Sequence, residues 1–108
     1  MIGEKFDKSF ITNNLINIIC DMNIKELSGL YLILNEWNKV KTKYPDNFVG
    51  HRHCLGVLRT ETIEYELAVT MHENDVKIMN ELKQVAQICL RGIVECCLIN
   101  DSILRGVI

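Results

Sequence analysis

The sequence predicts a helix-rich α+β fold in the order helix, helix, β-hairpin, long helix, within a single domain of residues 1–108. Three observations predict it. Apolar residues recur at helical spacing before residue 44 and again after residue 74. The spacing changes to two over residues 63–69, which is typical of a strand. The only proline, Pro45, separates the helical half from the mixed half.

The first helix is predicted over residues 8–22 and the second over residues 24–43. Apolar side chains form one stripe in the first helix: Phe10, Ile11, Leu15, Ile18, Ile19 and Met22. A second stripe follows: Leu27, Leu30, Tyr31, Leu34, Trp37 and Val40. Asn23 and Glu26 have the spacing of a capping box, and Pro45 ends the second helix.

A β-hairpin is predicted over residues 48–70. Four apolar residues alternate with mostly polar ones on its second arm: Ile63, Tyr65, Leu67 and Val69. Residues 48–58 would form the first arm, and residues 59–62 the connection. A helix over residues 60–72 is the main competitor, because Glu, Leu, Ala and Met are good helix formers. An all-α four-helix arrangement is therefore the alternative fold.

The last helix begins near Asn74 and Asp75 and becomes apolar nearly all round over residues 88–99. Such a helix must be covered on every side, and a chain of 108 residues has few other elements to cover it. Either the first two helices and the hairpin wrap it, or a second copy covers part of it. We expect a homodimer interface of about 1,600 Å². Its predicted residues are Leu90, Ile93, Val94 and Leu98.

Composition excludes several classes of protein. An apolar share of 48% argues against disorder, and a net charge of −2 produces no global field toward nucleic acid or membrane. The most apolar stretch is too short and too charged to span a bilayer, and the N-terminus lacks the pattern of a secretory signal. Five cysteines without a CxxC pair indicate free thiols in a reducing, cytoplasmic setting.

One group of residues has the side chains of a metal or catalytic site. His51, His53 and His72 offer three nitrogen ligands for zinc, and Cys54 a fourth ligand or a nucleophile. No second ligand pair with finger spacing exists, and no orienting acid or oxyanion-hole motif accompanies Cys54. We therefore expect ordinary surface histidines, no metal, no cofactor, no small-molecule substrate and no enzymatic activity, although metal binding at these residues stays open.

A basic segment supplies a candidate contact with RNA. Its phosphate-binding residues are predicted to be Lys39, Lys43, His51 and Arg52. If the hairpin forms, glutamates on its second arm pair across the strands with arginines on its first arm. That pairing would neutralise much of the basic segment.

The segment from Tyr44 to Phe48, with Gly50, Arg52 and the run 54–56, resembles the pre-coat proteins of plant geminiviruses. The resemblance implies a small, cytoplasmic, non-enzymatic protein that suppresses RNA silencing, binds RNA or host silencing factors, and self-associates. The prediction is therefore a non-enzymatic homodimeric interaction protein whose partner is RNA or a host protein. The alternative is an intracellular protein–protein adaptor or regulatory module without nucleic-acid binding.

Overall fold

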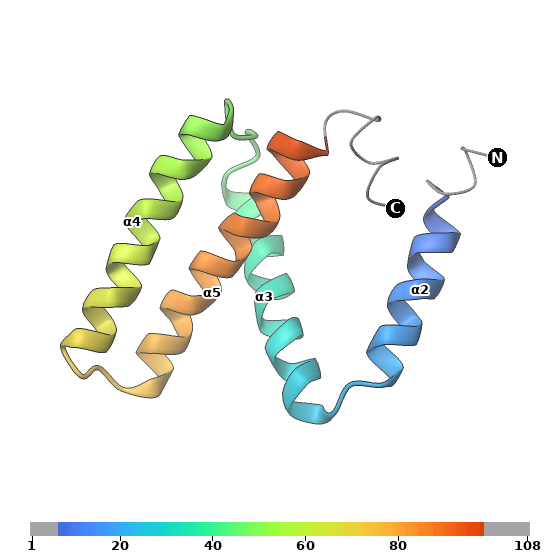
Figure 1. Cartoon of the computed structure of the whole chain (residues 1–108), viewed down its shortest axis with the longest axis horizontal. Coiled ribbons are helices and arrows are strands. Elements are labelled where there is room, and N and C mark those ends of the chain that lie inside the picture. Colours follow the sequence, from blue (N-terminus) through green and yellow to red (C-terminus); the bar gives the residue numbers. More distant parts are fainter. Residues whose placement is uncertain (1–6, 99–108) are drawn as a thin grey trace.

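The protein is all-α in the part of the chain that the computed structural model describes, residues 7–98 (Figure 1). Its helices are α2 (Lys8–Cys20), α3 (Ile24–Lys43), α4 (His51–Thr70) and α5 (Asp75–Gly92), followed by the π-helix η1 (Ile93–Cys97). These residues form no strand, so the predicted α+β fold and its hairpin are wrong, and the all-α alternative fits.

Helix α4 replaces the predicted hairpin because its sequence also carries a helical stripe. The side chains that are at least half-buried recur at three- and four-residue spacing: Cys54, Val57, Leu58, Glu61, Tyr65 and Ala68. Of the four residues that suggested a strand, only Tyr65 belongs to this stripe. Ile63, Leu67 and Val69 are 55%, 53% and 44% exposed. The alternation of period two therefore arose from exposed apolar residues rather than from a buried sheet face.

Local capping sets the start and end of α3 and the start of α5 where the sequence predicted them, whereas α2 ends at Cys20, two residues before its predicted end. Asn23 Oδ1 accepts from Glu26 N at 2.9 Å, and Glu26 Oε1 accepts from Asn23 N at 3.0 Å, so the predicted capping box at the start of α3 is confirmed. Helix α3 ends at Lys43, two residues before Pro45. Asn74 caps α5 by accepting from Lys77 N at 2.9 Å.

Helix α5 is the central element, because it packs against both α4 and α3. The most buried apolar cluster comprises Phe48, Ile88 and Cys96, with Cys54, Val57 and Leu58 packed against it. This cluster lies where α4 begins and α5 ends. Helix α2 stands apart from the other helices in Figure 1 and contains no buried residue.

Gly92 permits the close approach of α4 and α5. A Cβ at Gly92 would lie 2.8 Å from Cys54 Sγ, closer than van der Waals contact allows. Gly92→Ala is therefore expected to lower the free energy of unfolding by about 1 kcal/mol, although alanine favours helix. Urea denaturation measures this change. Adding Cys54→Ala removes the sulfur and is expected to make the alanine neutral or stabilising; a Gly92→Ala single variant at least as stable as wild type contradicts the prediction.

Candidate functional site

A cavity of about 350 Å³ lies between α3, α4 and α5. Its apolar wall includes Val40, Phe48, Val57 and Ile88. Its polar wall includes Glu61 of α4 and three residues of α5, Gln84, Gln87 and Arg91. An apolar cavity with a few polar groups is the usual form of a small-molecule site.

A buried ion pair lies at the Arg91 side of this cavity. Arg91 Nε donates to Glu95 Oε2 at 2.9 Å, and both side chains are 9% exposed. Glu95 Oε1 also accepts from the backbone N–H of Phe48 at 2.7 Å, and the Arg91 guanidinium lies 4.1 Å from the centre of the Phe48 ring. Burial acts to raise the pKa of Glu95, but the hydrogen bonds from Arg91 and Phe48 outweigh it and lower the pKa. This ion pair therefore ties α5 to the loop before α4.

A chain of amides crosses the cavity wall from α3 to α5. Gln84 Nε2 donates to Glu36 of α3, and Gln87 Nε2 donates to Gln84 Oε1 at 3.4 Å. Gln87 is only 3% exposed, and its Oε1 is a buried acceptor without a hydrogen-bond partner among the described residues. A buried amide oxygen without a partner costs about 1–3 kcal/mol, so this atom needs a donor.

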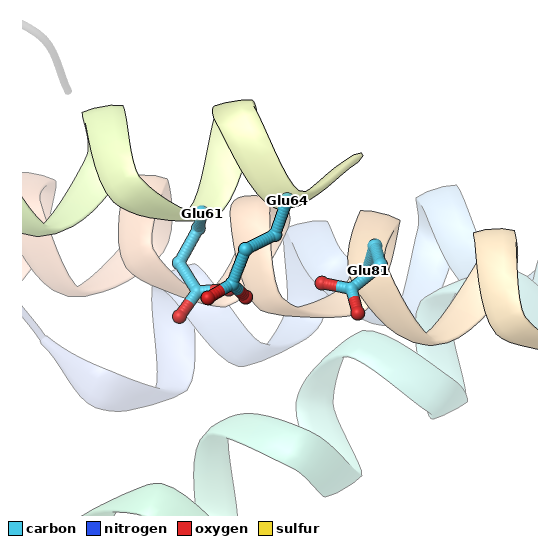
Figure 2. Close-up of side chains that lie close together, drawn as sticks. All are labelled: Glu61, Glu64 and Glu81. Atoms are coloured by element: carbon cyan, nitrogen blue, oxygen red, sulfur yellow. The ribbon is translucent and has the colours of Figure 1, made fainter. Parts of the chain in front are cut away.

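Three carboxylates lie close together where α4 packs on α5, as Figure 2 shows. One of them, Glu61, also lines the cavity. Glu61 and Glu64 come from α4 and Glu81 from α5, with one oxygen of each within 4.8 Å of the others. Burial, a hydrogen bond with Glu64 and the charges of Glu64 and Glu81 raise the pKa of Glu61 to about 7. Lys77 Nζ lies 3.3 Å from Glu81 and neutralises part of this charge. Oxygen ligands of this kind suit a hard divalent cation.

Glu61 makes stability depend on pH. Its carboxyl keeps a proton up to about pH 7 in the folded chain, whereas the unfolded chain loses that proton near 4.5. Stability is therefore expected to fall as pH rises from 4.5 through 7. Glu61→Gln removes this loss, because glutamine does not ionise. It should raise the free energy of unfolding by about 1 kcal/mol at pH 8 and change it little at pH 4. The value at pH 8 is smaller than the full pKa shift implies, because Glu61 is partly exposed to solvent. Urea denaturation at the two pH values tests it; an equal effect at both would contradict it.

A large apolar surface lies on α2 and the first half of α3, and we call it the apolar arm. Its large side chains are 38–76% exposed: Phe10, Leu15, Ile16, Ile18, Ile19, Ile24, Tyr31 and Leu34. The predicted stripe of the first helix forms as expected on α2, yet no residue of that helix is buried. Among residues 7–98 no other helix packs closely on α2. An apolar helix face that these residues leave open indicates an interaction surface.

The predicted phosphate-binding residues lie at one end of the molecule. Lys39 and Lys43 are on the last turns of α3, and His51 and Arg52 open α4 at the same end (Figure 1). All four are exposed, and none pairs with a carboxylate of residues 7–98 within 4 Å. The cross-strand neutralisation expected from a hairpin does not occur, because residues 51–70 are one helix.

The residues predicted for a dimer through the last helix are only partly covered. Ile93 and Val94 are 51% and 39% exposed, whereas Leu90 and Leu98 are half-buried. The predicted all-apolar helix therefore has one covered side, formed around Ile88 and Cys96, and one open side. The apolar arm exposes more large side chains than this end of α5 does.

The proposed zinc ligands are not brought together. His51 and His72 lie at opposite ends of α4, which at 20 residues is about 30 Å long. His53 instead accepts from the backbone N–H of Val49 at 3.0 Å. Burial and the nearby thiols of Cys96 and Cys89 raise the pKa of Cys54, so this thiol is not activated as a nucleophile.

Sequence reasoning missed the polar residues of the cavity. Gln84, Gln87 and Arg91 occupy the same helical face as the buried Ile88, at three- and four-residue spacing. That register was the available signal, since polar residues inside an apolar stripe must be satisfied after burial.

Searches of known protein families, curated proteins and solved structures found no match for this chain. Among residues 7–98, no helix has the length and apolar character needed to cross a membrane.

Proposed function

We propose that this chain is a non-enzymatic interaction protein that works as a homodimer formed through the apolar arm. The observation that carries the proposal is helix α2, which has an apolar face but no buried residue. Burying this face removes apolar surface from water, which is the main driving force of association. The resemblance to silencing suppressors is compatible with such a dimer, because those proteins self-associate.

The area of the apolar arm suits a stable interface. Its large side chains are on average about half exposed, and a large side chain has about 200 Å² of surface. Each therefore offers about 100 Å², and the whole arm at most about 800 Å². A standard protein interface buries about 800 Å² on each partner. A second copy of the arm supplies the matching area.

The charge pattern of α2 favours a second copy as the partner. Residues 9–20 contain no charged side chain, and their polar residues are neutral amides, hydroxyls and one thiol. In a twofold interface each surface meets itself, so any charge on it meets a like charge near the axis. The part of the arm on α2 avoids that repulsion, because residues 9–20 carry no charge. The asparagines can hydrogen-bond across the pair as donors and acceptors.

Sedimentation equilibrium of the pure protein tests the proposal. The expected mass at micromolar concentrations is twice the 12.5 kDa of the single chain. On dilution the average mass should fall toward the mass of the monomer. A single dissociation constant should describe this fall at all concentrations. A mass of one chain at every concentration up to about 100 μM would refute a homodimer of this area.

RNA binding at the basic end is a second candidate function. It is favoured by the exposure of Lys39, Lys43, His51 and Arg52 at one end of the bundle, without acidic partners in the described chain. Fluorescence anisotropy with a short duplex RNA is the test. Phosphate contacts predict an affinity that falls at least tenfold between 50 and 200 mM salt, and that falls further in Lys43→Ala. No binding at 50 mM salt rules this candidate out and leaves a protein-only module.

A further inference from the structure

Two residues in the wall of the cavity between α3, α4 and α5 have buried acceptor atoms that lack hydrogen-bond donors among residues 7–98. Glu36 sets the orientation of the two amides, Gln84 and Gln87, because a carboxylate accepts hydrogen bonds and does not donate them. Gln84 must therefore turn Nε2 toward Glu36 and Oε1 toward Gln87. Gln87 in turn must donate through Nε2, which leaves its buried Oε1 without a donor. Glu61, which lines the same cavity, also has a buried Oε2 without a partner.

Much of the remaining wall is apolar and aromatic, and Asp46, His53 and Arg91 complete it. Phe48, Val57 and Ile88 line the cavity together with the Tyr44 ring. The volume of about 350 Å³ is several times the roughly 30 Å³ that one water molecule occupies. It falls within the range of small-molecule sites. A ligand that fits both walls therefore needs an apolar body and several N–H donors at one end.

Charges around the cavity favour a cation over an anion. Arg91 is already paired with Glu95, and Lys77 with Glu81. The carboxylates of Glu36 and Glu61 face the shared wall from α3 and α4. Lys39 and Lys43 also border Glu61, but both are exposed and keep their hydration. Asp46 and Glu61, which line the cavity, have no paired cation among residues 7–98, so the wall keeps an acidic character and is rich in acceptors.

We propose that this cavity binds a small organic ammonium ion with an aromatic or aliphatic body. The ammonium group donates to Gln87 Oε1 and to the carboxylate of Glu61, while the body packs against Phe48, Val57 and Ile88. This inference does not rest on the homodimer, because the apolar arm forms no part of the cavity wall.

Protons compete with such a ligand at Glu61. The pKa of Glu61 is about 7, so its carboxyl is largely neutral at pH 6 and ionised at pH 8. Binding of the ammonium ion is therefore expected to strengthen as pH rises from 6 to 8. The charged and titratable groups near Glu61 come from every element around the cavity: Glu64 and His53 on α4, Glu36, Lys39 and Lys43 on α3, Tyr44 and Asp46 between α3 and α4, and Glu81 and Arg91 on α5.

Isothermal titration with three probes of one ring system tests the proposal on the full chain. Tryptamine, tryptophol and indole-3-propionate have similar size and carry positive, zero and negative charge. Tryptamine is expected to bind wild type at least tenfold more tightly than tryptophol, and indole-3-propionate most weakly. Equal affinity for the three probes, or no binding of tryptamine at millimolar concentration, would overturn the proposal and assign the cavity to water.

Two variants locate the binding within the cavity. Glu61→Gln and Gln87→Met should each weaken tryptamine binding at pH 8 by at least fivefold, and Glu61→Gln should abolish its dependence on pH. Glu66→Gln is the matched control, because Glu66 lies on α4 but is exposed and outside the cavity wall. Circular dichroism checks that each variant keeps its helices. A folded Glu61→Gln that binds tryptamine as wild type does would place the cation elsewhere and refute the site.

Discussion

Glu95→Ala is expected to lower the free energy of unfolding by about 3 kcal/mol. Glu95 accepts two hydrogen bonds from Arg91 and one from the backbone N–H of Phe48. Removing it leaves the Arg91 guanidinium, whose residue is only 8% exposed, without its counter-charge. A buried charge without a partner is far more costly than a paired one. Urea denaturation followed by circular dichroism measures the change.

A double variant distinguishes the cost of leaving Arg91 unpaired from the cost of losing side-chain volume at Glu95. Arg91→Met with Glu95→Leu removes both charges and keeps apolar volume, so it should recover much of the loss. Glu66→Ala, an exposed glutamate on α4, should change stability by less than about 0.5 kcal/mol. Because the pKa of Glu95 is lowered, its contribution is present above pH 4.5 and is lost as pH falls through the lowered value. A Glu95→Ala variant as stable as Glu66→Ala would contradict this account of the ion pair.

Leu15→Asp is expected to weaken the proposed homodimer at least a hundredfold. Leu15 lies on the apolar face of α2 and is 52% exposed in the single chain, so a charge there costs the monomer little. At the interface the same charge loses its water and finds no opposite charge on α2 of the partner, whose residues 9–20 are uncharged. A penalty of about 3 kcal/mol corresponds to this change in the dissociation constant. Sedimentation equilibrium measures it.

Two controls make the result specific. Asn13→Asp adds the same charge to the opposite side of α2 and should leave the dissociation constant within a few-fold of wild type. Ile93→Asp places it on the exposed side of η1, where the sequence predicted the interface. If Ile93→Asp dissociates the dimer and Leu15→Asp does not, the last helix forms the interface and the apolar arm does not.

The ends of α3 and the start of α5 could be predicted because they depend on local chemistry. Asn23, Glu26 and Asn74 satisfy backbone N–H groups within three residues, and Pro45 stops α3 wherever the chain lies. The stripe of α2 was equally plain. These features follow from spacing along a single helix, so the rest of the fold does not alter them.

Helix α4 could not be identified with certainty because two patterns overlap in its sequence. Ile63, Tyr65, Leu67 and Val69 fit a strand, whereas Leu58, Glu61, Tyr65 and Ala68 fit a helical face. The second pattern was hidden because one of its members, Glu61, is charged. Packing of this face on α5 decided between them, and such packing overrides the weak preferences of single residues.

By itself, the sequence determined the caps, the helix stripes, the charge balance and the basic residues around Pro45, all of which depend on neighbours along the chain. Only the tertiary structure decided that the apolar surface of α2 stays open and that Glu61, Gln87 and Arg91 line one cavity. The physical reason is that burial is a property of contacts between helices. Whether an apolar face is covered, or a carboxyl is desolvated, depends on which segments distant in sequence meet it in space.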